Sequence, residues 1–198
     1  SCGSSGKKGS SIPLFSPDVY KRRSTPSISI APTSREDFDR IFGALAENAE
    51  SIEMAPDETF WAEKTRGAGL QDARLRVSGR RHLDEALIAT GTPHQGHGNF
   101  DEWMKIFATI APQVAGIRRF GAAALDLAWV AAGRYDGFWE SDLAPWDTAA
   151  GCLLVREAGG FVSDYRGRSQ PICDSQIIAG NDQVHSRMHK LVSTALKA

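Results

Sequence analysis

The sequence lacks the features that mark membrane, secreted and nucleic-acid-binding proteins. No apolar run approaches the roughly 18 residues that a membrane-spanning helix needs, and no charged start is followed by the apolar stretch of a secretory signal. Its 23 lysines and arginines are matched by 24 aspartates and glutamates, so the formal net charge is −1 and no basic stripe indicates nucleic acid. We therefore expect a cytoplasmic protein that binds neither membrane nor nucleic acid.

Cysteine is also scarce, with three residues that lie far apart: Cys2, Cys152 and Cys173. They include no CxxC pair, which argues against a structural zinc site and against a disulfide framework. Thiols in a reducing cytoplasm are the simplest interpretation of this pattern.

The chain has 198 residues, enough for one core or for a domain and a half. Residues 1–11 are rich in Ser, Gly and Lys, which is typical of a linker, a tag or a disordered tail. Residues 12–34 contain four prolines around one candidate strand at 28–31, and residues 35–51 carry apolar side chains at helical spacing. We expect residues 1–55 to form an atypical or partly disordered N-terminal segment.

From residue 56 onward the pattern changes to alternating strands and helices. Strands are predicted at residues 59–63, 74–77, 86–90, 116–120, 135–140, 161–164 and 176–179. Helices are predicted at residues 100–110, 122–132, 148–158 and 182–196. The glycines at 67 and 69 are interpreted as a turn. The alternation predicts an α/β fold with βαβ units, a largely parallel sheet and two nearly all-apolar helices that are buried on most sides.

The most specific stretch is WDTAAGCLLVREAGG at residues 146–160, where an aspartate opens an apolar helix that ends in two glycines. The N-terminus of a helix has free N–H groups and the positive end of the dipole, so it attracts anions. Asp147 at this point can cap the helix, and it can also hold a hard cation that in turn binds a phosphate. On the residues alone, a capping role is the commoner one.

This stretch resembles the second signature of the inositol monophosphatase family, in which Trp-Asp precedes a small-residue helix and Gly-Gly. The resemblance implies that Asp147 is a Mg²⁺ ligand. The segment GAAALDLAWVAAGRYDGFWE at residues 121–140 is similar to the family segment just upstream, and residues 57–93 also resemble the family. The family-like region is therefore expected at residues 56–198.

The same resemblance implies which residues bind substrate. Glu140 lies seven residues before Asp147, where the family has a glutamate that contacts substrate hydroxyls; otherwise it would be a solvated carboxylate at a strand end. Gly121, Ala122 and Ala123 match the loop whose backbone faces the substrate; otherwise they form a tight strand-to-helix turn. Thr92 is a further candidate hydroxyl on the substrate side.

Two family elements are missing from this sequence. Members of the family carry a Glu-Glu pair and an Asp-Pro-x-Asp-Gly-Thr motif, which supply most metal-binding carboxylates and a threonine that helps to activate water. This chain contains no Glu-Glu and no Asp-Pro dipeptide. Asp147 alone cannot provide the near-octahedral oxygen coordination that Mg²⁺ needs. Other acidic residues such as Asp18, Glu36 and Asp37 have no motif support, and we expect that they do not converge on Asp147.

The resemblance implies a layered αβαβα sugar-phosphatase fold in which the C-terminal sheet domain is nearly whole and the N-terminal part is truncated or atypical. It also implies that a metal-activated water attacks a phosphate monoester without a covalent phosphoenzyme. Inositol monophosphate or a related sugar phosphate is the expected substrate, with histidinol phosphate and 3′-phosphoadenosine 5′-phosphate as alternatives. A different hypothesis is a catalytically inactive relative that acts as a binding or dimerising module. Members of the family are commonly dimers, so the resemblance implies a homodimer as a candidate assembly, while the sequence itself leaves the oligomeric state open.

For several other residues a structural role is the simpler interpretation. Arg118 and Arg119 could meet phosphate but are more simply a solvated rim, and His94 and His97 lie in a Gly-rich loop without a third metal ligand nearby. Asp136 with the glycine after it is most simply a turn. Three tryptophans are expected in the core: Trp103, Trp129 and Trp139.

Overall fold

The computed structural model describes residues 50–54, 58–94, 98–169 and 175–197. The strand predicted at 28–31 lies outside these residues, and so does the helix predicted at 35–51 except for its last two positions. Those two positions belong to a strand, so the helix does not extend to residue 51. The boundary proposed between residues 55 and 56 stays a prediction.

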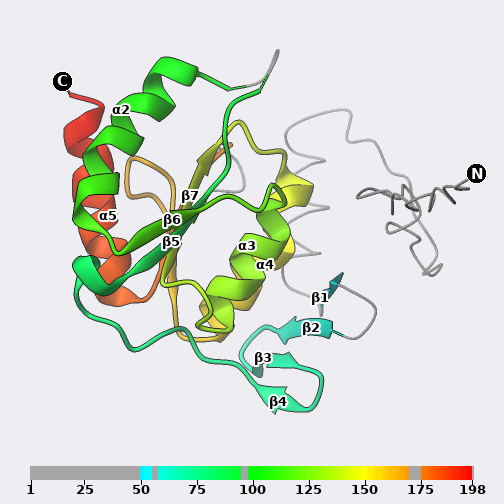
Figure 1. The fold of residues 1–198 in the computed structure, drawn as a ribbon. Coiled ribbons are helices and arrows are strands. Elements are labelled where there is room, and N and C mark those ends of the chain that lie inside the picture. The colour runs from blue at the N-terminus through cyan, green and yellow to red at the C-terminus, as the bar shows by residue number, and fades with distance from the viewer. Residues whose placement is uncertain (1–49, 55–57, 95–97, 170–174, 198) are drawn as a thin grey trace, which may run out of the picture. The chain divides into compact units, whose positions relative to one another are not determined.

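A four-stranded antiparallel sheet opens the described region, with its strands in chain order (Figure 1). Its strands are β1 (Glu50–Met54), β2 (Glu58–Glu63), β3 (Gly67–Leu70) and β4 (Ala73–Arg74). In β2 the side chains alternate, because Phe60 and Ala62 are buried while Trp61 is exposed. The strand predicted at 74–77 was wrong: β4 ends at Arg74, where pairing with β3 stops.

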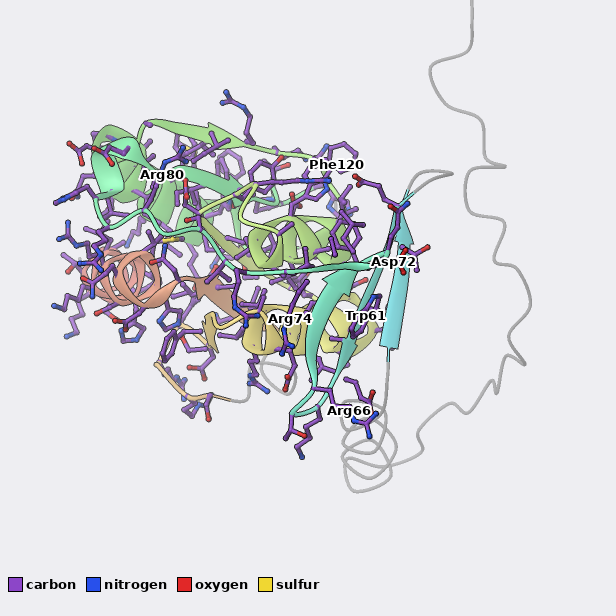
Figure 2. All side chains as sticks on the ribbon, turned by 90° about the horizontal axis from the view of Figure 1, so that it is seen from below. Trp61, Arg66, Asp72, Arg74, Arg80 and Phe120 are labelled. Carbon is purple, nitrogen blue, oxygen red and sulfur yellow. The ribbon has the colours of Figure 1, made fainter. Side chains whose placement is uncertain are left out.

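The glycines at 67 and 69 lie in strand β3, so the prediction of a turn there was wrong; the turn occupies the three residues before it. Gly69 pairs with Trp61 of β2, and a Cβ atom at position 69 would lie 2.4 Å from the Trp61 indole. The indole nitrogen donates a hydrogen bond to the Gln71 carbonyl oxygen at 2.8 Å. Figure 2 shows Trp61 and Arg74 on this sheet and Arg66 near its turn. Glycine is present here because a side chain would displace the indole.

A five-stranded sheet forms the second layer of strands, in the order β6-β5-β7-β9-β8. Its strands are β5 (Leu87–Thr90), β6 (Gly116–Arg118), β7 (Gly137–Ser141), β8 (Phe161–Ser163) and β9 (Gln176–Gly180). β5 is parallel to β6 and to β7, whereas β9 is antiparallel to β7 and to β8. Four of these five strands therefore run in the same direction, so the prediction of a largely parallel sheet is confirmed except at β9.

The antiparallel strand follows from how β8 and β9 are connected. β7 and β8 run in the same direction and are joined by a helix, as in a βαβ unit. β9 then turns back and inserts between them. The order of strands and helices along the sequence does not reveal the direction of β9, because a buried antiparallel strand has the same apolar pattern as a buried parallel one.

Helices cover both faces of the large sheet (Figure 1). They are α2 (Phe100–Ile110), α3 (Ala123–Ala131), α4 (Pro145–Glu157) and α5 (Asp182–Ala195). α3 and α4 pack on one face together with the small sheet, and α2 and α5 pack on the other. The described residues thus form four successive layers, sheet, helices, sheet, helices, which confirms the layered α/β fold and all four predicted helices.

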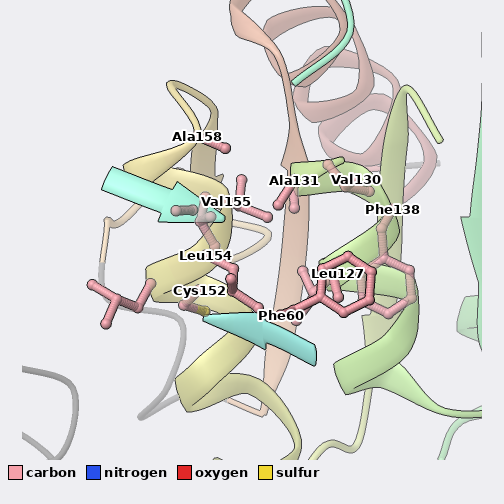
Figure 3. Close-up of a cluster of buried hydrophobic side chains, with 14 of the residues drawn as sticks. Phe60, Leu127, Val130, Ala131, Phe138, Cys152, Leu154, Val155 and Ala158 are labelled. Carbon is pink, nitrogen blue, oxygen red and sulfur yellow. The ribbon is translucent and has the colours of Figure 1, made fainter. Parts of the chain in front are cut away.

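The helical layer between the two sheets explains why α3 and α4 are apolar on nearly all sides. Phe60 of the small sheet and Phe138 of the large sheet belong to one buried cluster that includes Leu127 of α3 (Figure 3). Glu157 at the end of α4 accepts hydrogen bonds from the backbone N–H groups of Thr65 and Gly67 at 2.8 and 2.9 Å. α4 is therefore attached to the small sheet by packing along its length and by a carboxylate at its end.

We expect the substitution Gly151→Ala to destabilise the protein, although alanine favours helices. A Cβ atom at position 151 of α4 would lie 2.5 Å from the Leu127 Cβ and Cδ1 atoms, so α3 and α4 would have to separate. Overpacking of this kind costs about 1–3 kcal/mol, which exceeds the gain in helix propensity of about 1 kcal/mol. Urea unfolding measures the change in the free energy of unfolding.

The matched control combines Gly151→Ala with Leu127→Gly, which removes both of the Leu127 atoms that the new methyl group would meet. The double variant should lose less stability than the sum of the two single variants. If the losses of stability in the two single variants simply add up in the double variant, the contact between positions 151 and 127 is contradicted.

Candidate functional site

The candidate site lies where the carboxyl ends of the parallel strands meet. β5 leads into α2 on one face of the sheet, and β7 leads into α4 on the opposite face. Two neighbouring parallel strands whose connections leave in opposite directions open a crevice between their ends, which is where α/β sheets bind ligands. Residues 91–94 follow β5, residues 119–122 follow β6, and Glu140 lies at the end of β7.

The loop before α3 provides the backbone that the sequence assigns to substrate. Gly121 has φ +93°, which favours glycine, and the Arg119 guanidinium lies against it, 3.1 Å from where a Cβ atom would stand. Ala122 is the N-cap of α3 and offers no capping side chain, and Ala123 is the first residue of the helix. No side chain therefore caps the start of α3, which faces the carboxyl ends of the strands.

Glu140 is half-buried, so the alternative of a solvated strand-end carboxylate does not hold. The pKa of its carboxyl is raised to about 7, chiefly by burial and also by the charges of Asp126 and Asp147, while Arg119 lowers it. The charged side chains of Asp126 in α3, Asp147 in α4 and Arg119 in the loop before α3 therefore lie near enough to Glu140 to affect its ionisation. A carboxylate in such a place is a strong acceptor for hydroxyl groups when it is ionised.

Asp147 is the third residue of α4 rather than the residue that opens it, because the helix begins at Pro145. Its Oδ2 atom accepts a hydrogen bond from the backbone N–H of Ala144, the N-cap residue, at 2.9 Å. This is the reciprocal half of a capping box, in which an acidic third residue reaches back to the N-cap. The Oδ1 atom has no hydrogen-bond partner among the described residues, so Asp147 both caps the helix and keeps one oxygen for another ligand.

The sequence analysis missed Asp126, which lies in the first half of α3. Its side chain is completely buried, and neither carboxylate oxygen has a hydrogen-bond partner in the described part of the chain. Burial is the main cause that raises its pKa to about 7, against the opposing charge of Arg119. The available signal was that Asp126 is the one charged residue in the nine-residue helix AALDLAWVA.

Of the other residues that the sequence analysis named, some lie at the candidate site and others only support the fold. The Arg119 charge acts on Glu140 and Asp126, whereas Arg118 donates to the carbonyl oxygen of its neighbour Ile117. A small pocket, here called the β5–β7 pocket, is lined by Thr92, His94, Trp103, Ser141 and Glu140 among others.

Asp136 is not merely a turn residue, since its Oδ2 accepts from the Leu87 N–H at 2.7 Å and from Arg80 at 3.0 Å. Trp139 is fully buried, Trp129 is half-buried against the core, and Trp103 lines the pocket instead. His97 lies outside the described residues.

Comparison with known proteins decides the family. The family model described as "Inositol monophosphatase family" matches residues 41–197. The chain belongs to the inositol monophosphatase family.

Relatives of this family resemble the chain over most of its length. An inositol-1-monophosphatase from Rhizobium meliloti is 49% identical over 77% of the chain and 55% of the relative. A Nus factor SuhB from Pseudomonas aeruginosa is 50% identical over 68% of the chain and 51% of the relative. The crystal structure of extragenic suppressor protein suhB from Bartonella henselae superposes with a TM-score of 0.70 at 46% identity, covering 73% of this chain and 57% of that one. The chain spans about half the length of the curated relatives it matches.

The described residues of this family member fit a metal site only in part. Asp147 offers one free carboxylate oxygen, but no group of three or more His, Cys, Asp or Glu side chains within the described ranges is arranged to hold a metal ion. The acidic residues Asp18, Glu36 and Asp37 lie outside those ranges, and so do Cys2 and Cys173. None of the described helices is long and apolar enough to cross a membrane.

We expect Asp126→Asn to stabilise this family member at high pH and not at low pH. The pKa of Asp126 rises on folding from its ordinary 3.8 to about 7, so the folded state holds this proton more tightly than the unfolded state does. Stability is therefore lost as the pH rises from about 4 to about 7, and the loss is complete above that range. Asparagine cannot ionise, and the variant should be more stable than the wild type by roughly 1–3 kcal/mol at about pH 8.

Urea unfolding at several pH values measures this difference. The exposed Asp84→Asn serves as the control and should show no such pH-dependent gain. A difference between Asp126→Asn and the wild type that does not change with pH would refute the assignment.

Proposed function

We propose that this chain carries the substrate side of a phosphatase that hydrolyses a phosphate monoester, most simply inositol monophosphate or a related sugar phosphate. The observation that carries this proposal is that Glu140 near the end of β7 and Asp147 in the first turn of α4 lie at the same carboxyl edge of the large sheet, where the Asp147 charge helps to raise the Glu140 pKa. The family resemblance assigns the first to substrate hydroxyls and the second to Mg²⁺. Relatives named inositol-1-monophosphatase support the same substrate class.

Each residue of the site has a distinct role in this proposal. Glu140 accepts hydrogen bonds from two neighbouring hydroxyls of the alcohol and so orients the phosphate ester. The N-terminus of α3 at Ala122 and Ala123 presents backbone N–H groups to the bound substrate. Asp147 would hold a Mg²⁺ ion through one carboxylate oxygen, and the described residues provide no group of three or more ligands for it. Such an ion, when bound, would supply the positive charge needed to activate a water molecule and to neutralise the phosphate.

The alcohol part of the substrate distinguishes the candidates. A cyclitol or a sugar presents neighbouring hydroxyls, which a half-buried carboxylate such as Glu140 binds well. Histidinol phosphate and 3′-phosphoadenosine 5′-phosphate are the alternatives within the family. The polar groups of each differ from a vicinal diol, so Glu140 would bind them less well. The acceptor chemistry of Glu140 favours the polyol.

A binding or dimerising module is the second candidate. The missing Asp-Pro-x-Asp-Gly-Thr motif favours it, and several relatives are named Nus factor SuhB rather than phosphatase.

A homodimer is proposed under either function. The buried thiol of Cys152 is in line with the reducing cytoplasm that we propose as its location.

Phosphate release from myo-inositol 1-phosphate tests the proposal, measured on the purified chain with Mg²⁺ and again with EDTA. We expect turnover that requires Mg²⁺ and is lost in Asp147→Asn. Glu140→Gln should raise the KM roughly 10- to 100-fold, because a hydrogen bond to a charged group contributes about 1.5–3 kcal/mol.

Circular dichroism of each variant controls for folding, and the exposed Asp84→Asn controls for the loss of one negative charge. Absence of turnover above the Asp147→Asn background would refute catalysis by this chain and leave the binding module as its function.

A further inference from the structure

The Glu140 carboxylate occupies the space that a side chain at position 91 would fill. A Cβ atom built on Gly91 would lie 1.8 Å from Oε1, 2.0 Å from Cδ and 2.5 Å from Oε2 of Glu140. Real Cβ atoms essentially never approach other heavy atoms so closely. Gly91 is itself buried. The carboxylate therefore lies directly on the backbone of position 91.

The register of the parallel strands explains this contact. Thr90 of β5 pairs with Trp139 of β7, so the next positions, 91 and 140, are also neighbours. Ala89 and Phe138, two residues earlier, both face the α3–α4 layer. Side chains alternate along a strand, so positions 91 and 140 face that same layer. Glu140 can lean across the end of β5 only because its neighbour there has no side chain.

Space, and not backbone conformation, requires glycine at position 91. Its φ lies outside the left-handed region, so any residue could adopt this backbone. Other glycines in the described region have different reasons: Gly121 has a positive φ, and Gly151 allows two helices to approach each other. Gly79 also has an ordinary φ, but nothing lies within 4 Å of its missing Cβ atom. Gly91 and Gly79 thus form a natural test and control pair.

We propose that Gly91 is a positioning and specificity-determining residue that holds Glu140 over the end of β5 and directs its carboxylate toward the alcohol part of the substrate. This inference rests on the proposed function of Glu140. Gly91 and Glu140 both line the β5–β7 pocket, together with Thr92 and Ser141. The pocket is small and partly polar, which suits the hydroxyl-bearing side of a cyclitol or sugar. A larger residue at position 91 would push the carboxylate out and remove selection for neighbouring hydroxyls.

The first arm of the test is structural and does not depend on turnover. A crystal structure of Gly91→Ala should show the Glu140 carboxylate displaced by about 1 Å or more, since a methyl carbon and a carboxylate need van der Waals separation. Asp147 and the start of α3 should stay in place. Gly79→Ala should leave Glu140 unmoved. A Gly91→Ala structure in which Glu140 keeps its position would overturn the proposal.

The second arm measures selectivity between substrates. The ratio of kcat/KM for myo-inositol 1-phosphate to kcat/KM for 4-nitrophenyl phosphate should fall roughly tenfold in Gly91→Ala, because the second substrate has no neighbouring hydroxyls. Gly79→Ala should leave the ratio unchanged. An unchanged ratio in Gly91→Ala would overturn the specificity role.

A compensating variant separates positioning from a general structural effect. Glu140→Asp shortens the side chain by one methylene, so a methyl group at position 91 should then change the ratio by less than about twofold. The same tenfold loss in both backgrounds would overturn the proposal. If the wild-type chain shows no turnover at all, the proposed function fails, and the crystal structures still decide whether Gly91 positions Glu140.

Discussion

The packing of α3 and α4 between two sheets is the constraint on which the rest of the structure depends. Both helices bury apolar side chains on opposite sides at once, so neither can rotate or slide without opening a cavity in one of the two interfaces. Close approach at Gly151 fixes the distance between them. The start of each helix is thereby held at the carboxyl edge of the large sheet, and it is from these two starts that Ala122 and Asp147 extend toward the site.

A site built in this way collects more negative than positive charge from the residues that the structure describes. The charges of Asp126 and Asp147 act on Glu140, and the Arg119 charge opposes the pKa shifts of both Glu140 and Asp126. Burial is the largest cause that raises the pKa of both Glu140 and Asp126 to about 7, so these two carboxyls resist ionisation. A cation bound beside them would lower both pKa values and favour the ionised carboxylates, as the Mg²⁺ ion proposed above would require.

Sequence reasoning succeeded where a single local pattern decides the structure. The apolar runs of the four helices and the strands of the large sheet are of this kind. It failed where the answer depends on a partner distant in the sequence: the insertion of β9 between β7 and β8, and the strand around Gly69, whose reason is the indole of Trp61. The helix start at Pro145 was predictable, since proline favours the first turn. The sequence marked Asp126 only as the single charged residue of an apolar helix, and its burial could not be predicted without the fold.

The glycines show why the residues of such a site are hard to find from one sequence. At Gly121 the backbone angle demands glycine, and a strand-to-helix turn predicts it. At Gly91 the backbone demands nothing, and the reason for glycine is a carboxylate that belongs to a strand 49 residues later in the chain. The reason becomes visible only when the register of two parallel strands is known. A functional residue can thus be defined by the side chain it lacks, because what it contributes to the site is the space in which Glu140 lies.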